Sequence, residues 1–232
     1  MPRCDSQGTF LGYVGYCLDI ADNMRTEKIL REKTVLLQEV HHRVKNNLAV
    51  TASLLSMKSA GCGPEARLAL EESLQRIHAI ALVHECLCNN DHLDRIDFGQ
   101  YARYLAQSIH ATLGGDQNRI GLELDLDSVE LGFERAVSCA LILNELLTNA
   151  FKYAFADGRA GRVLVCFRQT EPGRCELAVE DNGAGLPEGA LNEQNSSLGL
   201  RIVRILTGQL NGLVEQKACP GTHIVLRFPT AS

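Results

Sequence analysis

The 232-residue sequence lacks an apolar run that could cross a membrane, since a spanning helix needs roughly 20 consecutive apolar residues. Its N-terminus, MPRCDSQGTF, lacks the continuous apolar stretch of a signal peptide. It also lacks an excess of basic residues, because 28 acidic residues against 23 lysines and arginines leave a net charge of -5. Nucleic acids and anionic membrane surfaces do not attract such a chain. We therefore expect a soluble, cytoplasmic protein that binds neither nucleic acid nor membrane.

A disulfide framework is absent as well. The nine cysteines are odd in number and scattered, and most lie in apolar segments, where reduced cysteine behaves as a small hydrophobic residue. No C-x-x-C pair occurs. His84 and Cys88 would share one helix face, and with Cys86 and His92 they could form a zinc site. The packed end of a helix is the simpler interpretation of this cluster.

Two long helices are predicted in the N-terminal half. Residues 9–19 predict a single short strand that has no partner strand to complete a sheet. From about Ala21 the seam of a paired helix follows, at Leu30, Leu37, Val40, Val44, Leu48, Thr51 and Leu55. The breaker Gly61-Cys62-Gly63-Pro64 separates it from a second helix, from about Glu65 to Asn89. The pair predicts an antiparallel hairpin, and dimerisation into a four-helix bundle would bury its apolar seam.

The C-terminal half alternates between strands and helices. The pattern predicts helices at 98–112, 134–155 and 198–210 and strands at 119–126, 162–168, 175–180 and 223–228. This order is typical of a two-layer α/β sandwich, so the fold class of the whole chain is expected to be α+β. The boundary between hairpin and sandwich should fall within 90–97, which divides the chain into segments 1–20, 21–92 and 93–232.

The segment EVHHRVKNNL, Glu39 to Leu48, is a polar cluster in a helix whose seam is otherwise apolar. Because His42 lies two residues past the seam position Val40, we expect it to face solvent. An exposed neutral imidazole can act as a nucleophile towards a phosphoryl group near pH 7. A solvated helix face, or polar residues that set the register of a dimer, would explain the same residues, and this motif alone does not decide between them.

The segment NELLTNAFKY, Asn144 to Tyr153, places Glu145, Asn149, Lys152 and Tyr153 along one stripe of a helix. A carboxylate and an amide oxygen one turn apart suit a hard cation, which prefers oxygen ligands. The lysine one turn further on can reach a phosphate as a point charge. An amphipathic helix with ordinary polar residues on its surface is the alternative.

Three glycine-containing motifs follow. In DNGAGLP, residues 181–187, Gly183 and Gly185 allow a sharp turn, and Asp181 could accept a hydrogen bond from an exocyclic amine. SSLGLRIV, residues 196–203, opens a helix whose free N–H groups suit phosphate, and GTHIVLRFP opens the last strand. Neither the Rossmann pattern G-x-G-x-x-G nor the P-loop pattern G-x-x-x-x-G-K is present. Each motif is modest alone, and their order within one domain carries the argument.

In this order the last four motifs resemble the ATP-binding domain that histidine kinases share with DNA gyrase, MutL and Hsp90-type chaperones. With EVHHRVKNNL the resemblance narrows to sensor histidine kinases of the HisKA_2/HWE-related branch, over about residues 25–230. It implies an ATP-dependent protein histidine kinase of two-component signalling, with ATP and Mg²⁺ in its site. Residues 21–92 would dimerise and carry the phosphorylated histidine, and 93–232 would bind ATP. Residues 1–20 are similar to the end of a PAS sensor domain.

The resemblance also implies roles for single residues. His42 would accept the phosphoryl group and pass it to a response regulator receiver domain, with His41 as the rival acceptor. Arg43 stands where an acidic residue usually follows the phosphoacceptor, so Glu39, three residues earlier, is the candidate base. At the phosphate end, Glu145 and Asn149 would hold Mg²⁺, and Lys152, Gly199 and Leu200 would contact the phosphates. Tyr153 would lie near the nucleotide. At the adenine end, Asp181 would bind the adenine amine beside Gly183 and Gly185, and Thr222 would line the pocket.

Three other functions are compatible with parts of this pattern. An ATPase of the same fold would need no histidine on a paired helix. A serine kinase of the anti-sigma-factor type would lack the long N-terminal hairpin. A dimeric scaffold with a degenerate pocket would not need NELLTNAFKY and DNGAGLP intact. In a kinase, the linker at 90–97 would act as a hinge between hairpin and sandwich.

Overall fold

The computed structural model describes residues 2–13, 21–88, 95–114, 119–186, 190–191 and 197–230. The chain forms two compact units, Met1–Leu37 and Gln38–Ser232. In the first, β1 (Pro2–Cys4) pairs with β2 (Phe10–Tyr13) in an antiparallel hairpin. The expectation of a lone strand over 9–19 was therefore wrong. The turn explains the pairing, because Asp5 Oδ1 accepts the backbone N–H groups of Gln7 and Thr9 at 2.9 and 2.8 Å.

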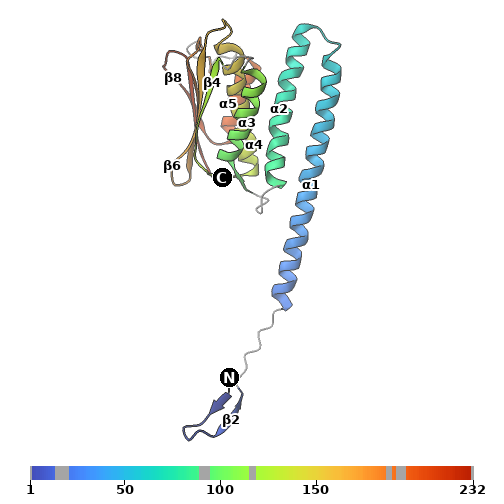
Figure 1. The fold of residues 1–232 in the computed structure, drawn as a ribbon, viewed down its shortest axis with the longest axis vertical. Helices are drawn as coiled ribbons and strands as arrows, with labels where there is room; N and C mark the ends of the chain where they lie inside the picture. The colour runs from blue at the N-terminus through green and yellow to red at the C-terminus, as the bar shows by residue number, and fades with distance from the viewer. Residues whose placement is uncertain are drawn as a thin grey trace. The chain divides into compact units, whose positions relative to one another are not determined.

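The predicted helical hairpin is confirmed. Helix α1 (Ala21–Ser59) and helix α2 (Pro64–Cys88) are separated by the predicted Gly-Cys-Gly-Pro breaker. In the second unit, α1 from Gln38 onward runs antiparallel to α2 (Figure 1). The ion pair between Lys45 and Glu85, 2.7 Å long, joins the two helices. Among the described residues, no helix is both long and apolar enough to span a bilayer.

The remainder is a mixed sheet covered by helices. The sheet has the order β4 (Ile120–Leu126), β6 (Gly161–Glu171), β7 (Arg174–Asp181), β9 (Thr222–Pro229), β8 (Leu213–Lys217). Only β4 and β6 run parallel among these neighbouring pairs. Helices α3 (Phe98–Leu113), α4 (Phe133–Asn149) and α5 (Leu198–Gln209) lie on one face of it (Figure 1). The α+β fold with a two-layer sandwich is therefore confirmed.

Helix α4 is the central helix of the second unit. It packs between the sheet and the hairpin, so that eleven of its seventeen residues are buried, including the polar Asn144, Glu145 and Thr148. It continues directly into a π-helical turn, Ala150–Ala154. Wide helical turns of this kind are frequent at functional sites. Glu145 of the predicted polar stripe is therefore buried, whereas Tyr153 at its far end is exposed.

In the second unit, three short strands were not predicted: β3 (Arg95–Asp97), β5 (Glu130–Gly132) and the edge strand β8. The cluster considered for zinc also finds a different explanation. His84 is 7% exposed and packs against His41 and Phe133. The side chain of Cys88 and all of His92 lie outside the described residues. Within the described part of the chain, no group of three His, Cys, Asp or Glu side chains could hold a metal ion.

Candidate functional site

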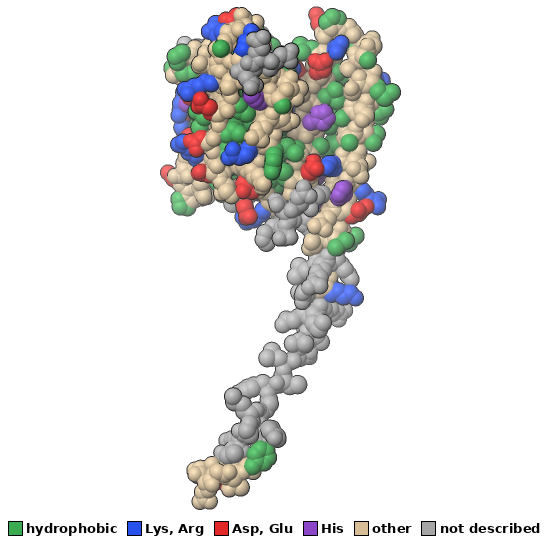
Figure 2. Space-filling view, in the orientation of Figure 1, with side chains coloured by type: hydrophobic (Ala, Val, Ile, Leu, Met, Phe, Trp, Pro, Cys, Tyr) green, Lys and Arg blue, Asp and Glu red, His purple; other side chains and the backbone are tan. Residues whose placement is uncertain are grey.

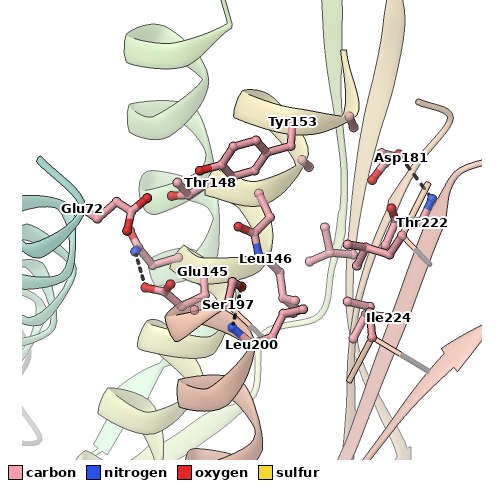
Figure 3. Close-up of a pocket in the computed structure, with 18 of the residues that line it drawn as sticks. Glu72, Glu145, Leu146, Thr148, Tyr153, Asp181, Ser197, Leu200, Thr222 and Ile224 are labelled. Atoms are coloured by element: carbon pink, nitrogen blue, oxygen red, sulfur yellow. Dashed lines mark hydrogen bonds between the residues drawn. The ribbon is translucent and has the colours of Figure 1, made fainter. Parts of the chain in front are cut away.

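A cavity of about 380 Å³ lies between α4, α5 and the ends of β7 and β9 (Figure 3). Its volume falls in the range of small-molecule sites. Most of its wall comes from the predicted motifs, and α2 adds two side chains, Glu72 and Gln75. Polar groups gather at two places: Asp181 lies at the sheet, and Glu145 and Asn149 lie on α4. Figure 3 shows Glu145 and Asp181 on opposite sides, so the site has a separate polar group at each end.

At the α4 end, the Glu145 carboxylate is 5% exposed and accepts two hydrogen bonds from Arg76 of α2, at 2.7 and 3.0 Å. Asn149, one turn later, is half-buried, lines the cavity and is the last residue of α4. Gly199 packs so closely against this carboxylate that a Cβ would lie 2.5 Å from Oε2. Two oxygen-bearing side chains therefore project toward the same part of the cavity.

The π-helical turn places Lys152 and Tyr153 beside these residues. The Lys152 ammonium is buried and makes no hydrogen bond within the described residues, although the Glu72 carboxylate lies 3.9 Å away. Tyr153 is 54% exposed. Burial first, and then the negative Glu72, raise the pKa of its phenol. A buried ammonium that lacks an acceptor suits a phosphate oxygen, so this end of the cavity fits an anion and a cation together.

At the opposite end, Asp181 is 5% exposed and ends β7. Its Oδ1 accepts the backbone N–H groups of Gly183 at 2.9 Å and Thr222 at 3.3 Å. The sheet register sets this geometry, because Asp181 and Thr222 are partners across β7 and β9 (Figure 3). With Oδ1 used in this way, the second carboxylate oxygen is left to bind a donor in the cavity.

Position 183 requires glycine because the backbone of Ala154 lies too close to leave room for a side chain. A Cβ at this position would overlap the carbonyl oxygen of Ala154, which also accepts the N–H of Ala184 at 2.8 Å. We expect Gly183→Ala to lower the free energy of unfolding by about 1–3 kcal/mol, the usual cost of overpacking. Gly208→Ala in α5 is the matched control, since no atom lies within 4 Å of its Cβ. This control should be neutral or stabilising by about 1 kcal/mol in urea unfolding, and an equal loss in both variants would contradict the argument.

The helix N-terminus predicted to bind phosphate is present. Ser197 caps α5 by accepting the N–H of Leu200 at 3.5 Å. Ser197, Gly199 and Leu200 all line the cavity. The N-terminal end of α5 therefore directs its positive dipole end into the same space as Glu145.

On the hairpin, His42 and Glu39 are exposed, and the Glu39 carboxylate pairs with Arg43 at 2.7 Å. His41 is half-buried instead, with its Nδ1 3.0 Å from Nδ1 of His84. The two neighbouring histidines thus differ sharply, because one faces solvent and the other is enclosed by α2 and Phe133. His42 is not among the residues that line the cavity.

The His41–His84 contact should make the fold sensitive to acid. Burial lowers the pKa of both imidazoles from the ordinary 6.5, and His41 lowers that of His84 further. The unfolded chain then binds more protons, so stability should fall as the pH drops below about 6.5. We expect His84→Gln to reduce the loss of unfolding free energy between pH 7.5 and 5.5, measured in urea. An identical pH dependence in the variant would exclude this contact as the cause.

Two family models match the chain: "Histidine kinase" (HisKA_2) at residues 39–113, and "Histidine kinase-, DNA gyrase B-, and HSP90-like ATPase" at residues 134–232. The sensor histidine kinase PdtaS of Mycolicibacterium smegmatis is 33% identical over 96% of this chain and 45% of its own length. The chain belongs to the sensor histidine kinase family. It is also 28% identical to blue-light-activated histidine kinase 2 of Erythrobacter litoralis, over 94% of this chain and 63% of that protein.

A solved structure of a histidine kinase domain agrees in fold. The domain comes from a blue-light activated histidine kinase of Erythrobacter litoralis, with a TM-score of 0.64 and 26% sequence identity. The structural match covers 86% of this chain and 94% of that domain. This histidine kinase chain spans less than half the length of the PdtaS proteins that it matches. Its C-terminal part is thus an ATP-binding domain of the gyrase and HSP90 type.

In this histidine kinase, eight of the ten residues predicted to bind nucleotide line the cavity: Glu145, Asn149, Tyr153, Asp181, Gly185, Gly199, Leu200 and Thr222. Lys152 and Gly183 lie directly beside it. The prediction missed Thr148 and the α2 residues Glu72 and Gln75. Thr148 lies within the predicted motif, whereas the α2 residues belong to no motif, so no local signal marks them.

Proposed function

We propose that this chain phosphorylates His42 with Mg²⁺-ATP in the cytoplasm and passes the phosphoryl group to an aspartate of a response regulator receiver domain. The observation that carries the proposal is the two-ended cavity: Asp181 lies at one end and Glu145 and Asn149 lie at the other, beside a buried Lys152 ammonium that makes no hydrogen bond within the described residues. The arrangement suits a purine at one end and metal-bound phosphates at the other. The exposed His42 belongs to the same compact unit.

Each residue of the cavity has a task in this proposal. Asp181 accepts a hydrogen bond from the adenine amine. Glu145 and Asn149 hold Mg²⁺, which when bound neutralises charge on the phosphates. Lys152 binds a phosphate oxygen. The residues fit these groups because the Lys152 ammonium finds no hydrogen-bond acceptor among the described residues, and carboxylate and amide oxygens suit Mg²⁺.

The reaction requires the hairpin and the ATP-binding domain to meet. A ring nitrogen of His42 attacks the γ-phosphorus in line, an N–P bond forms, and the P–O bond to ADP breaks. The remaining proton of the imidazole passes to a base, for which Glu39 is our candidate once it leaves Arg43. Among the described residues, none of α1 lines the cavity, so α1 must approach it. Residues 90–97 are our candidate hinge. Of these, 90–94 lie outside the described residues, and Arg95–Asp97 form β3.

A homodimer is part of the proposal because the hairpin exposes large apolar side chains. Figure 2 shows hydrophobic atoms on its surface. The exposed apolar side chains of α1 include Val40, Val50, Leu54 and Met57, which are 53%, 60%, 59% and 75% exposed. A second hairpin would bury them in a four-helix bundle. The chain's proposed regions are accordingly 21–92 for dimerisation and phosphotransfer and 93–232 for ATP binding, with 1–20 as the end of a sensor.

Incubation with γ-labelled ATP and Mg²⁺ tests the proposal. A histidine kinase incorporates label that is lost in acid and stable in base. Label that survives acid would indicate a serine kinase. Release of phosphate without label on the protein would indicate an ATPase of the same fold, and either result would overturn the proposal.

Asp181→Asn should weaken the binding of ATP by about 10-fold or more, since a hydrogen bond to a charged group contributes about 1.5–3 kcal/mol. Asparagine keeps one oxygen for the N–H groups of Gly183 and Thr222, so the turn should survive. Calorimetric titration measures the affinity, and the melting temperature reports on the fold. Asp125→Asn, at an exposed position on β4, is the matched control. Unchanged affinity in Asp181→Asn would exclude this carboxylate from nucleotide binding.

A further inference from the structure

The contact between Arg76 and Glu145 is not explained by the reaction. Arg76 belongs to α2 and Glu145 to α4, 69 positions later in the chain. Nε of Arg76 lies 2.7 Å from Oε1 of Glu145, and Nη2 of Arg76 lies 3.0 Å from Oε2 of Glu145, so the pair is bidentate. The side chains are only 15% and 7% exposed. Bidentate pairs of this kind are strong and geometrically specific.

This pair occupies both oxygens of a carboxylate that the proposed function assigns to the metal. Mg²⁺ binds carboxylate oxygens at about 2.1 Å and demands nearly ideal octahedral geometry. A guanidinium that bonds both oxygens leaves fewer lone pairs for a metal, and its positive charge repels a second cation. Arg76 therefore disfavours metal binding to Glu145 in this arrangement.

Glu72, one turn earlier on α2, likewise faces a residue that the proposed function assigns to the ligand, the phosphate-binding Lys152. The Glu72 carboxylate lies 3.9 Å from the Lys152 ammonium and 3.9 Å from Arg76. It also lines the cavity (Figure 3). One turn of α2 therefore presents a cation to the metal-binding carboxylate and an anion to the phosphate-binding lysine. The positive Arg76 thus takes the place of the metal ion, and the negative Glu72 takes the place of the phosphate.

We propose that Arg76 and Glu72 form a latch that stands in for the metal and phosphate of Mg²⁺-ATP, so that nucleotide and α2 compete for Glu145 and Lys152. The proposal rests on the nucleotide site described above. It assigns the hairpin a role in loading the site: a movement that shifts this turn of α2 raises the affinity for nucleotide. By linkage, nucleotide binding loosens the same turn.

The latch is local, because the C-terminal part of α2 is anchored. Ala79, Val83 and Leu87 are fully buried in the core of the second unit. The Tyr101 hydroxyl also donates to the carbonyl oxygen of Ala79 at 3.0 Å. Only the turn that carries Glu72, Gln75 and Arg76 has to move when nucleotide enters. A further bond there, Thr148 Oγ1 to Gln75 Oε1, is 3.3 Å long.

The test is the affinity of the whole chain for ADP with Mg²⁺ and with EDTA, by calorimetry. Arg76→Gln should tighten Mg²⁺-ADP binding by about fivefold or more, within the usual range of coupling between sites, and should change the metal-free affinity less. Glu72→Gln should tighten both. Arg67→Gln is the matched control, because Arg67 lies on the same helix in an exposed pair with Glu71. Weaker or unchanged Mg²⁺-ADP binding in Arg76→Gln would overturn the latch.

A second measurement needs no variant and guards against misfolding. Hydrogen exchange in peptides that cover 65–80 should become faster in the wild-type chain when Mg²⁺-ADP is added, and unchanged or slower exchange would contradict the latch. The failure of the nucleotide site itself is distinguishable. In that case wild-type protein would bind no ADP, or would bind it without any dependence on Mg²⁺. If wild-type binding depends on Mg²⁺ and Arg76→Gln leaves it unchanged, only the latch is wrong.

Discussion

Replacement of His42 by alanine is expected to reduce acid-labile phosphorylation of the chain below detection. His42 is exposed on α1, where its imidazole can reach a phosphate carried by another domain. His41 has no such access, because it is half-buried and its Nδ1 lies 3.0 Å from that of His84. The measurement is incorporation of label from γ-labelled ATP, followed by acid and base treatment. Circular dichroism and ADP binding should remain those of the wild-type chain.

Two further histidine variants serve as controls. His78→Ala removes an exposed histidine of α2 and should retain full labelling. His41→Ala should retain most of the label, although it also removes the contact with His84. Loss of label in His41→Ala together with its persistence in His42→Ala would reverse the assignment of the phosphoacceptor.

Much of the fold is readable from local patterns. The hairpin follows from two long seams and one Gly/Pro breaker, and the predicted helix ends lie within about two residues of those observed. The sandwich helices and the central strands were also predictable, since each has a strong period and a buried face. His41 and His42 differ because His41 contacts His84 of α2 and Phe133 whereas His42 faces solvent, although the predicted seam residue Val40 is itself exposed.

The features that escaped prediction depend on partners distant in the sequence or on very short segments. Strands β3 and β5 are three residues each, too short for a period, and they exist because they pair with each other. The hairpin of β1 with β2 depends on the Asp5 turn rather than on any apolar alternation. Arg76 and Glu72 have ordinary surroundings on α2, and only the packing of α2 against α4 brings them to the nucleotide site.

Replacement of Asn149 by alanine is expected to remove the dependence of nucleotide binding on Mg²⁺. Asn149 ends α4 and lines the cavity one turn after Glu145. Loss of even an outer-shell partner typically costs about 10–100-fold in metal affinity, so loss of a direct ligand should cost at least as much. We therefore expect Mg²⁺-ADP binding to weaken by about 100-fold, with little change in EDTA.

The comparison between the two conditions isolates the metal. A general loss of the pocket would weaken binding in EDTA as well, whereas the loss of one metal ligand affects only the Mg²⁺ titration. Asn47→Ala provides a matched control, because Asn47 is exposed on α1 and does not line the cavity. Since Arg76 competes with the metal through Glu145 alone, Arg76→Gln in the Asn149→Ala background should recover part of the lost affinity. Mg²⁺ dependence that survives in Asn149→Ala would place the metal elsewhere in the cavity.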